Sequence, residues 1–141
     1  MKLAICTDVF ADLSYTDMLD KVKSLGIDAV EMTAGGWGAR KHCNTAELLA
    51  DEGKRKEFMG ELEKRGMRIS ALNTSCNPLW PSKTGEEYKK SMYDCATLAG
   101  LLGVKKIVAM AGLPAGNETD TTPNWITSTV SWPDFMAPAY E

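Results

Sequence analysis

The stretch Ser24-Leu25-Gly26-Ile27-Asp28-Ala29-Val30-Glu31 carries the pattern that decides the fold. A helical segment ends at a glycine, an apolar residue follows, and an apolar strand begins within a few positions. The same order recurs at Lys64–Ala71 and at Leu102–Ala109. Glycine suits the left-handed residue just past a helix end, and the next apolar side chain can fold back onto the last turn. The chain is therefore expected to contain three helix-to-strand junctions of one kind.

Together with an apolar segment near the N-terminus, these junctions predict the order β-α-β-α-β-α-β, which is typical of parallel α/β folds. Strands are expected at residues 3–9, 29–33, 68–73 and 106–110. Helices are expected from about Ser14 to the first junction, and at residues 45–50, 54–64 and 86–102, with a break near Gly53. The first strand is almost wholly apolar, as in a strand that is covered on both faces.

Two parallel architectures fit this order, a doubly wound sheet and a barrel. The turn after the first strand, Asp8-Val9-Phe10-Ala11-Asp12, contains no glycine, which disfavours a nucleotide-binding doubly wound sheet. A closed barrel of eight βα units needs about 250 residues, and the chain has 141. The expected fold is therefore the first half, strands 1–4, of a (β/α)8 TIM barrel. Residues 1–111 would form this half-barrel, and residues 112–141 a long ordered loop that is truncated.

Composition excludes several classes of partner. The net charge is −3 and the charges are interspersed, which argues against a nucleic-acid surface. No apolar run approaches the length of a membrane span, and the N-terminus does not form a signal peptide. The sequence therefore predicts a cytoplasmic protein without membrane or nucleic-acid contacts. Its four cysteines have no metal-ligand spacing and are expected to be thiols.

Three segments carry a resemblance to a known family. Gly26–Glu31, Ile69–Asn73 with Asn77-Pro78-Leu79, and the stretch Ala96–Gly103 before a strand resemble the xylose-isomerase-like barrel family. Residues 112–116 and 123–127 are similar to its sugar phosphate isomerase/epimerase branch. The resemblance implies an isomerase that transfers a proton next to a carbonyl of a sugar or sugar phosphate, with a divalent metal stabilising the enediolate.

The chain departs from that family in two ways. Complete members hold their metal with residues from the second half of the barrel, so no metal site is expected from this chain alone. A histidine is common in the loop after strand three, where this chain has Thr74, Ser75 and Cys76. The open edges of a half-barrel also invite pairing with another chain. We therefore expect self-association or a missing C-terminal half. Two alternatives stay open: a non-catalytic module that binds a small polyol or phosphate, and an inactive fragment.

Chemistry in βα barrels gathers at the C-terminal ends of the strands. Glu31 ends the second strand and is the expected catalytic carboxylate, unless it forms a structural ion pair with a neighbouring basic residue. Asn73 and Asn77 flank the loop after strand three, where they would bind substrate hydroxyls or serve turn chemistry. Cys76 lies in the same loop and is also a candidate for substrate binding. As a nucleophile it would need a nearby base, and none is close in sequence, so a packing role is preferred there. Asp8 ends strand one as either a cap or a site carboxylate.

The remaining candidates lie in the other loops. His42, the only histidine, is a candidate for binding a sugar hydroxyl, but a solvated loop histidine is the preferred interpretation. The glycine-rich segment 35–38, with its neighbouring basic residues, is a weak candidate for a phosphate cradle. Trp37 and Trp125 fall in loops, as does Trp80, where they would either stack on a sugar or pack the loops together.

Overall fold

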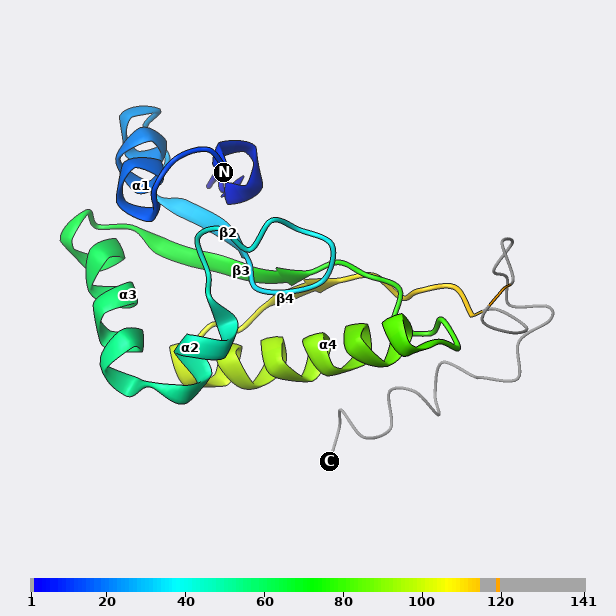
Figure 1. The fold of residues 1–141 in the computed structure, drawn as a ribbon. Helices are drawn as coiled ribbons and strands as arrows, with labels where there is room; N and C mark the ends of the chain where they lie inside the picture. Colours follow the sequence, from blue (N-terminus) through cyan, green and yellow to red (C-terminus); the bar gives the residue numbers. More distant parts are fainter. Residues whose placement is uncertain (1, 115–118, 120–141) are drawn as a thin grey trace.

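The computed structural model describes residues 2–114 and Thr119, and Figure 1 shows their arrangement. In chain order the elements are β1 (Ile5–Cys6), η1 (Thr7–Phe10), α1 (Tyr15–Ser24), β2 (Ala29–Thr33), α2 (Thr45–Ala50), α3 (Glu52–Lys64), β3 (Arg68–Thr74), α4 (Lys83–Leu102) and β4 (Ile107–Ala109). All neighbouring strands pair in parallel, in the order β1-β2-β3-β4. This arrangement confirms the α/β class. The strands follow one another in sequence order, whereas a doubly wound sheet reverses direction at its switch point.

The three junction glycines have the conformation that the repeat predicts. Gly26, Gly66 and Gly103 have φ angles of 76°, 60° and 68°. The amide of the residue after each glycine donates back into the last helical turn, as Met67 N does to Leu62 O at 2.9 Å. These are the hydrogen bonds of a left-handed helix cap. The apolar residue after each glycine also packs against the main core. One local motif therefore ends α1, α3 and α4 and directs the chain into the next strand.

The alternation of side chains gives the sheet two distinct faces. Val30, Met32 and Leu72 point to one face, where they are fully buried among helix residues. We call this the helix-covered face. Figure 1 shows α4 running beneath β3 and β4 on that side. The core there includes Met18, Leu19 and Val22 of α1, Leu62 of α3, and Leu98 of α4.

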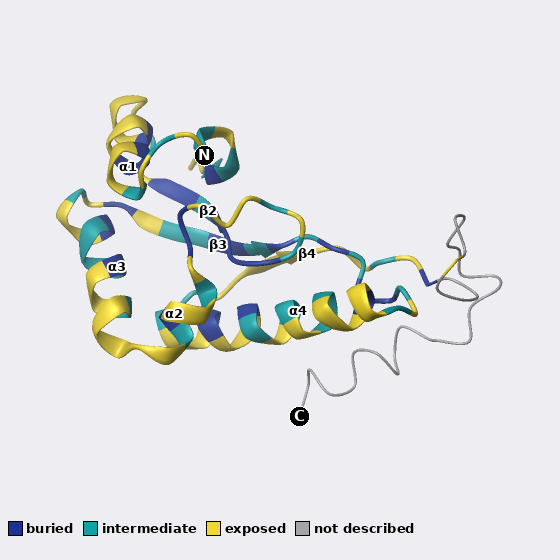
Figure 2. Ribbon diagram, viewed as in Figure 1, coloured by how far each residue is buried: buried dark blue, intermediate teal, exposed yellow. Residues whose placement is uncertain are grey.

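The opposite face, which we call the open face, is formed by Cys6, Glu31, Ala71, Asn73 and Val108. Cys6 pairs with Glu31, Glu31 with Ala71, and Asn73 with Val108, so these side chains share one side of the sheet. Figure 2 shows that β2 is buried along most of its length whereas β4 is exposed.

Strand one is shorter than expected. The predicted strand at residues 3–9 is wrong at both ends, because β1 begins only at Ile5 and residues 7–10 form the 3₁₀ turn η1. The loop after β2 approaches this turn closely. A side-chain carbon added at Gly38 would meet Thr33 Cγ2 at 2.2 Å and Asp8 Oδ2 at 2.7 Å. Asp8 therefore lies against this loop and does not continue the ladder.

Helix boundaries follow from their caps. Ser14 accepts a hydrogen bond from Asp17 N, so α1 begins where the sequence predicts. The predicted break between two helices is present, but it lies at Asp51 and not near Gly53. Asp51 Oδ1 accepts a hydrogen bond from Lys54 N, and α3 therefore begins at Glu52. The long helix α4 begins three residues earlier than expected, because Ser82 caps its first turn through Gly85 N.

Two expectations from composition can be compared with the described residues. All four cysteines are free thiols. Within residues 2–114, no helix has both the length and the apolar character needed to cross a membrane. Most of the expected long loop at residues 112–141 lies outside the described residues. Trp125 is one of the residues outside the described part.

Candidate functional site

The open face brings Glu31 and Asn73 together. Asn73 Nδ2 donates to Glu31 Oε1 at 2.6 Å, from β3 to the adjacent strand β2. The other side of the same amide is also fixed, because Asn73 Oδ1 accepts from Ser75 N at 2.8 Å. The amide therefore has one orientation, with its nitrogen toward the carboxylate. Both side chains are half-buried. Asn73 lies near the C-terminal end of β3, the edge where the chemistry of βα folds gathers. Glu31 is the middle residue of β2, because the strand continues to Thr33, so the expectation that Glu31 ends the second strand is wrong.

The structural alternative for Glu31 was an ion pair with a basic neighbour. Seven ion pairs join described residues, and none of them involves Glu31. Among the same residues, the only hydrogen bond to the carboxylate comes from Asn73. A half-buried carboxylate that is held by a neutral amide can still accept a proton or bind a hydroxyl group.

Asn77 has a different role from Asn73. Its Oδ1 accepts from Leu113 N and its Nδ2 donates to Leu113 O, both at 2.9 Å. The same oxygen accepts from Leu79 N at 3.3 Å, which is the turn chemistry that the sequence offered as an alternative. The backbone at position 112 lies so close to Asn77 that it requires a glycine, because an added side-chain carbon would lie 2.7 Å from Asn77 Oδ1. Asn77 thus ties the loop after β3 to the segment after β4.

The amides of the glycine-rich loop are bonded within the protein from Ala34 to Trp37, which argues against a phosphate cradle. The amides of Ala34 and Gly35 donate to Asn73 O, and Trp37 N donates to Ser75 O at 3.0 Å. Gly36 N donates to Ser91 Oγ of α4, also at 3.0 Å. The amides of residues 34–37 are therefore bound within the protein, and an anion would have to displace them. Their effect is to hold the loop against β3 and α4.

This anchored loop presents Trp37 at the rim of a pocket. The cavity has a volume of about 660 Å³, and the described residues that line it include Trp37, Asn77, Trp80 and Tyr88. Trp37 is 56% exposed and meets Tyr88 edge to face, with ring centroids 6.2 Å apart and ring planes at 87°. Ser82 and Thr84, at the start of α4, add hydroxyl groups. Two predicted residues, Trp37 and Asn77, are thus brought together.

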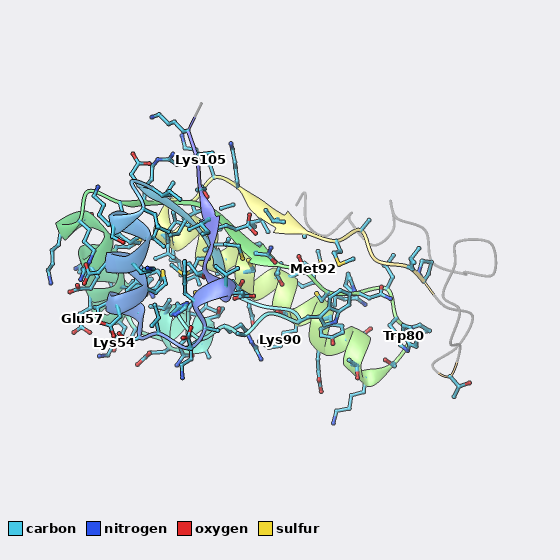
Figure 3. All side chains as sticks on the ribbon, turned by 90° about the horizontal axis from the view of Figure 1, so that it is seen from above. Lys54, Glu57, Trp80, Lys90, Met92 and Lys105 are labelled. Carbon is cyan, nitrogen blue, oxygen red and sulfur yellow. The ribbon has the colours of Figure 1, made fainter. Side chains whose placement is uncertain are left out.

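His42 lies away from this pocket. It is only 6% exposed, so the preferred interpretation of a solvated loop histidine is wrong. Its Nε2 lies 3.1 Å from Leu13 O, and because a carbonyl only accepts, this nitrogen carries the proton. His42 lines a separate groove with Lys54 and Glu57. Figure 3 places those two residues at the opposite end of the molecule from Trp80.

Cys76 cannot contact a substrate in this structure, which corrects the expectation of substrate binding. Its side chain is fully buried, and Sγ donates to Thr74 O at 3.3 Å. Burial raises the pKa of the thiol, which disfavours the reactive thiolate. The loop between Asn73 and Asn77 turns this residue inward, toward Tyr88 O of α4.

The described residues do not fit the divalent metal that the resemblance implies for complete family members. No three histidine, cysteine, aspartate or glutamate side chains gather within the described part of the chain in a way that would hold an ion. The Glu31 pair offers a single carboxylate, and its neighbour directs an N–H group toward it. No step of the chemistry below is therefore assigned to a metal.

Sequence reasoning missed several residues that shape the site. Ser91 anchors the glycine loop from 55 positions away, and Tyr88 supports Trp37. The predicted helix at residues 86–102 includes Tyr88, but nothing in the sequence paired it with Trp37. Such long-range pairs leave no local signal.

Comparison with known proteins defines the class of fold. The structure is similar to the crystal structure of the probable 3-DHS dehydratase AsbF, involved in petrobactin synthesis, from Bacillus anthracis. The TM-score is 0.56 and the identity 20%, over 80% of this chain and 39% of AsbF. At this identity the likeness shows the fold alone. AsbF is a TIM barrel, and the four parallel βα units described here have the fold of the first half of a (β/α)8 barrel.

A closer relative is found among the curated proteins. The chain is 52% identical over 136 residues to the uncharacterized protein YfiH of Bacillus subtilis (strain 168), which covers 96% of this chain and 44% of the relative. The chain thus spans less than half of the length of the curated relative it matches. No family model matches the sequence.

Proposed function

We propose that this chain supplies one wall of the active site of a barrel enzyme that isomerises or epimerises a sugar or sugar phosphate. The reaction would be proton transfer next to a carbonyl group. The observation that carries the proposal is the Glu31–Asn73 pair, a carboxylate held by an oriented amide on the open face of the sheet. The resemblance of three sequence segments to the xylose-isomerase-like family and the TIM-barrel fold support the same class.

In this proposal Glu31 is the proton acceptor. Asn73 Nδ2 occupies Oε1, and no described residue bonds the second oxygen, Oε2. That oxygen takes the proton from the carbon next to the carbonyl, and the electron pair of the broken C–H bond moves into an enediolate. Return of the proton to the neighbouring carbon gives an isomer, and return to the opposite face of the same carbon gives an epimer. A positioned carboxylate of this kind contributes about 10²–10⁴-fold to such a transfer.

The open face would need to be closed before it could exclude water. This chain spans 44% of YfiH and 39% of AsbF, which supports a model in which further βα units complete the barrel. Those units would come from a longer polypeptide or from a second copy of the chain. They would cover the exposed strand β4 and supply the groups that stabilise the enediolate.

Isotope exchange tests the assignment of Glu31. The natively expressed protein would be incubated in deuterated water with a panel of aldoses, ketoses and their phosphates, and deuterium at the carbon next to the carbonyl followed by proton NMR. We expect Glu31→Gln to slow exchange by about 10²–10⁴-fold. Glu87→Gln is the matched control, because Glu87 is an exposed carboxylate on α4 outside the site. Exchange by Glu31→Gln at the unmodified rate would contradict the proposal.

A further inference from the structure

The pocket beside Trp37 is not explained by proton transfer, because Glu31 is not among the residues that line it. Its volume of about 660 Å³ lies within the usual range for a site that takes a small molecule. Aromatic side chains form much of its wall, with a few hydroxyl groups and one amide beside them. This combination binds a ligand that has both an apolar face and hydrogen-bonding groups on its rim.

Trp37 is exposed but firmly held. Its own amide is bound to Ser75 O, and the preceding amide of Gly36 is bound to Ser91 Oγ. Gly36 has a φ of 71° and approaches Ser75 so closely that an added side-chain carbon would lie 2.3 Å from Ser75 O. The loop therefore fixes the backbone on which the indole stands. An aromatic ring positioned in advance in this way loses little conformational entropy when a ligand binds.

The contact with Tyr88 leaves ring surface available. In an edge-to-face pair, the edge of one ring covers the face of the other, so the rings do not stack on each other. With more than half of its surface exposed, the Trp37 indole can accept a flat apolar partner. Ser82 Oγ accepts from Gly85 N, which leaves the hydroxyl proton of Ser82 free to donate to a ligand.

The described lining also has a definite charge character. It contains tryptophan, tyrosine, serine, threonine and asparagine, and no acidic, basic or histidine side chain among the described residues. A charged phosphate group would find no counter-charge on this wall. A neutral ring would need none.

We infer that the pocket formed by Trp37, Trp80, Tyr88 and the hydroxyl groups of Ser82 and Thr84 binds an uncharged polyhydroxylated ring, a pyranose or a cyclitol, through stacking on Trp37. This assignment rests on the proposed function, because it identifies the part of the substrate that is held away from Glu31. The assignment places the neutral ring of the substrate in the pocket. Any charged group of the substrate would lie outside this uncharged lining.

Ligand-observed NMR on the native full-length protein tests the inference, with methyl β-D-glucopyranoside and myo-inositol as neutral probes and glucose 6-phosphate as the charged probe. We expect saturation transfer to the ring protons of the neutral probes. Trp37→Ala should weaken their binding by roughly tenfold, and Trp37→Phe, which keeps a ring face, by less. Tyr93→Ala is the matched control, because Tyr93 lies on the same helix as Tyr88, is 39% exposed and does not line the pocket.

Each outcome decides the inference. Binding of the neutral probes that falls in the order unmodified, Trp37→Phe, Trp37→Ala would support it. Equal binding by unmodified protein and Trp37→Ala, binding of the phosphorylated probe alone, or no binding of any neutral probe would overturn it. Failure here is separate from failure of the proposed function, because the latter is judged by isotope exchange in Glu31→Gln and not by ring binding.

Discussion

Val30 and Glu31 are adjacent in β2, yet they belong to different parts of the molecule. Val30 is fully buried on the helix-covered face, among apolar side chains of the helices. Glu31 points to the open face, is half-buried, and is bonded by Asn73. The comparison shows how a βα sheet separates two tasks within a few residues. The helix-covered face supplies stability, and we propose that the open face supplies chemistry.

The largest stability effect should come from the helix-covered face. Leu72 is fully buried there, in the central strand β3. Leu72→Ala removes apolar contacts and leaves a cavity, so we expect the free energy of unfolding to fall by about 2–5 kcal/mol. Urea denaturation would measure it. Leu101→Ala is the matched control, because Leu101 is 50% exposed on α4 and should change stability by less than about 0.5 kcal/mol. Equal losses in both variants would break the comparison between the faces.

The next effect concerns the open face, where Asn73 is expected to act on Glu31. Asn73→Ala removes a charge-assisted hydrogen bond, which is worth about 1.5–3 kcal/mol, so isotope exchange should slow by roughly tenfold to a hundredfold. Asn73→Asp keeps an acceptor for Ser75 N but places a second carboxylate beside the first. We expect isotope exchange by Asn73→Asp to be at least as slow as exchange by Asn73→Ala. Normal exchange in both variants would show that Asn73 does not position Glu31.

The smallest effect is expected at the outer surface. Arg65 bridges Asp20 of α1 at 2.6 Å and Glu61 of α3 at 2.7 Å. Its hydrogen bond lowers the pKa of Asp20, and Lys64 together with Arg65 lowers the pKa of Glu61. A carboxyl group with a lowered pKa stabilises the fold above its unfolded pKa, about 4, and loses this contribution as the pH falls through the folded value.

Arg65→Met should therefore lower the melting temperature slightly at pH 7, and the difference from unmodified protein should shrink as the pH falls below about 4. Added salt should also reduce this difference in melting temperature, because Asp20 is largely exposed. Thermal unfolding followed by circular dichroism at several pH values would measure this trend. A difference that stays constant across the acidic range would show that Arg65 acts through packing alone.

Much of the fold was predictable because its signals are local. A left-handed glycine followed by an apolar residue acts within one helical turn, so the ends of α1, α3 and α4 can be read from the sequence. The strand at residues 29–33 and the helix at residues 45–50 have the bounds that the sequence predicts. The predicted end of β1 was wrong because residues 7–10 form a 3₁₀ turn, whose Asp8 lies close to Gly38 of another loop, and the local apolar pattern does not report such a contact.

The candidate site was predicted less completely. The proximity of Glu31 and Asn73 was predictable, because they lie on successive parallel strands; their roles in a site stay a prediction. His42 and Cys76 were placed in the right loops, but whether a loop side chain is buried is decided by distant partners such as Leu13 O and Tyr88 O. The expectation that the chain itself supplies no metal site, like the cytoplasmic location, stays a prediction.

The most direct test of the division between the two faces combines two measurements on Glu31→Gln: the melting temperature and the rate of deuterium exchange. A carboxylate kept for chemistry adds little to stability, and replacing such a group often leaves a protein equally or more stable. The account predicts an unchanged or raised melting temperature together with a loss of exchange. A lowered melting temperature with exchange intact would contradict it, because Glu31 would then be a structural residue.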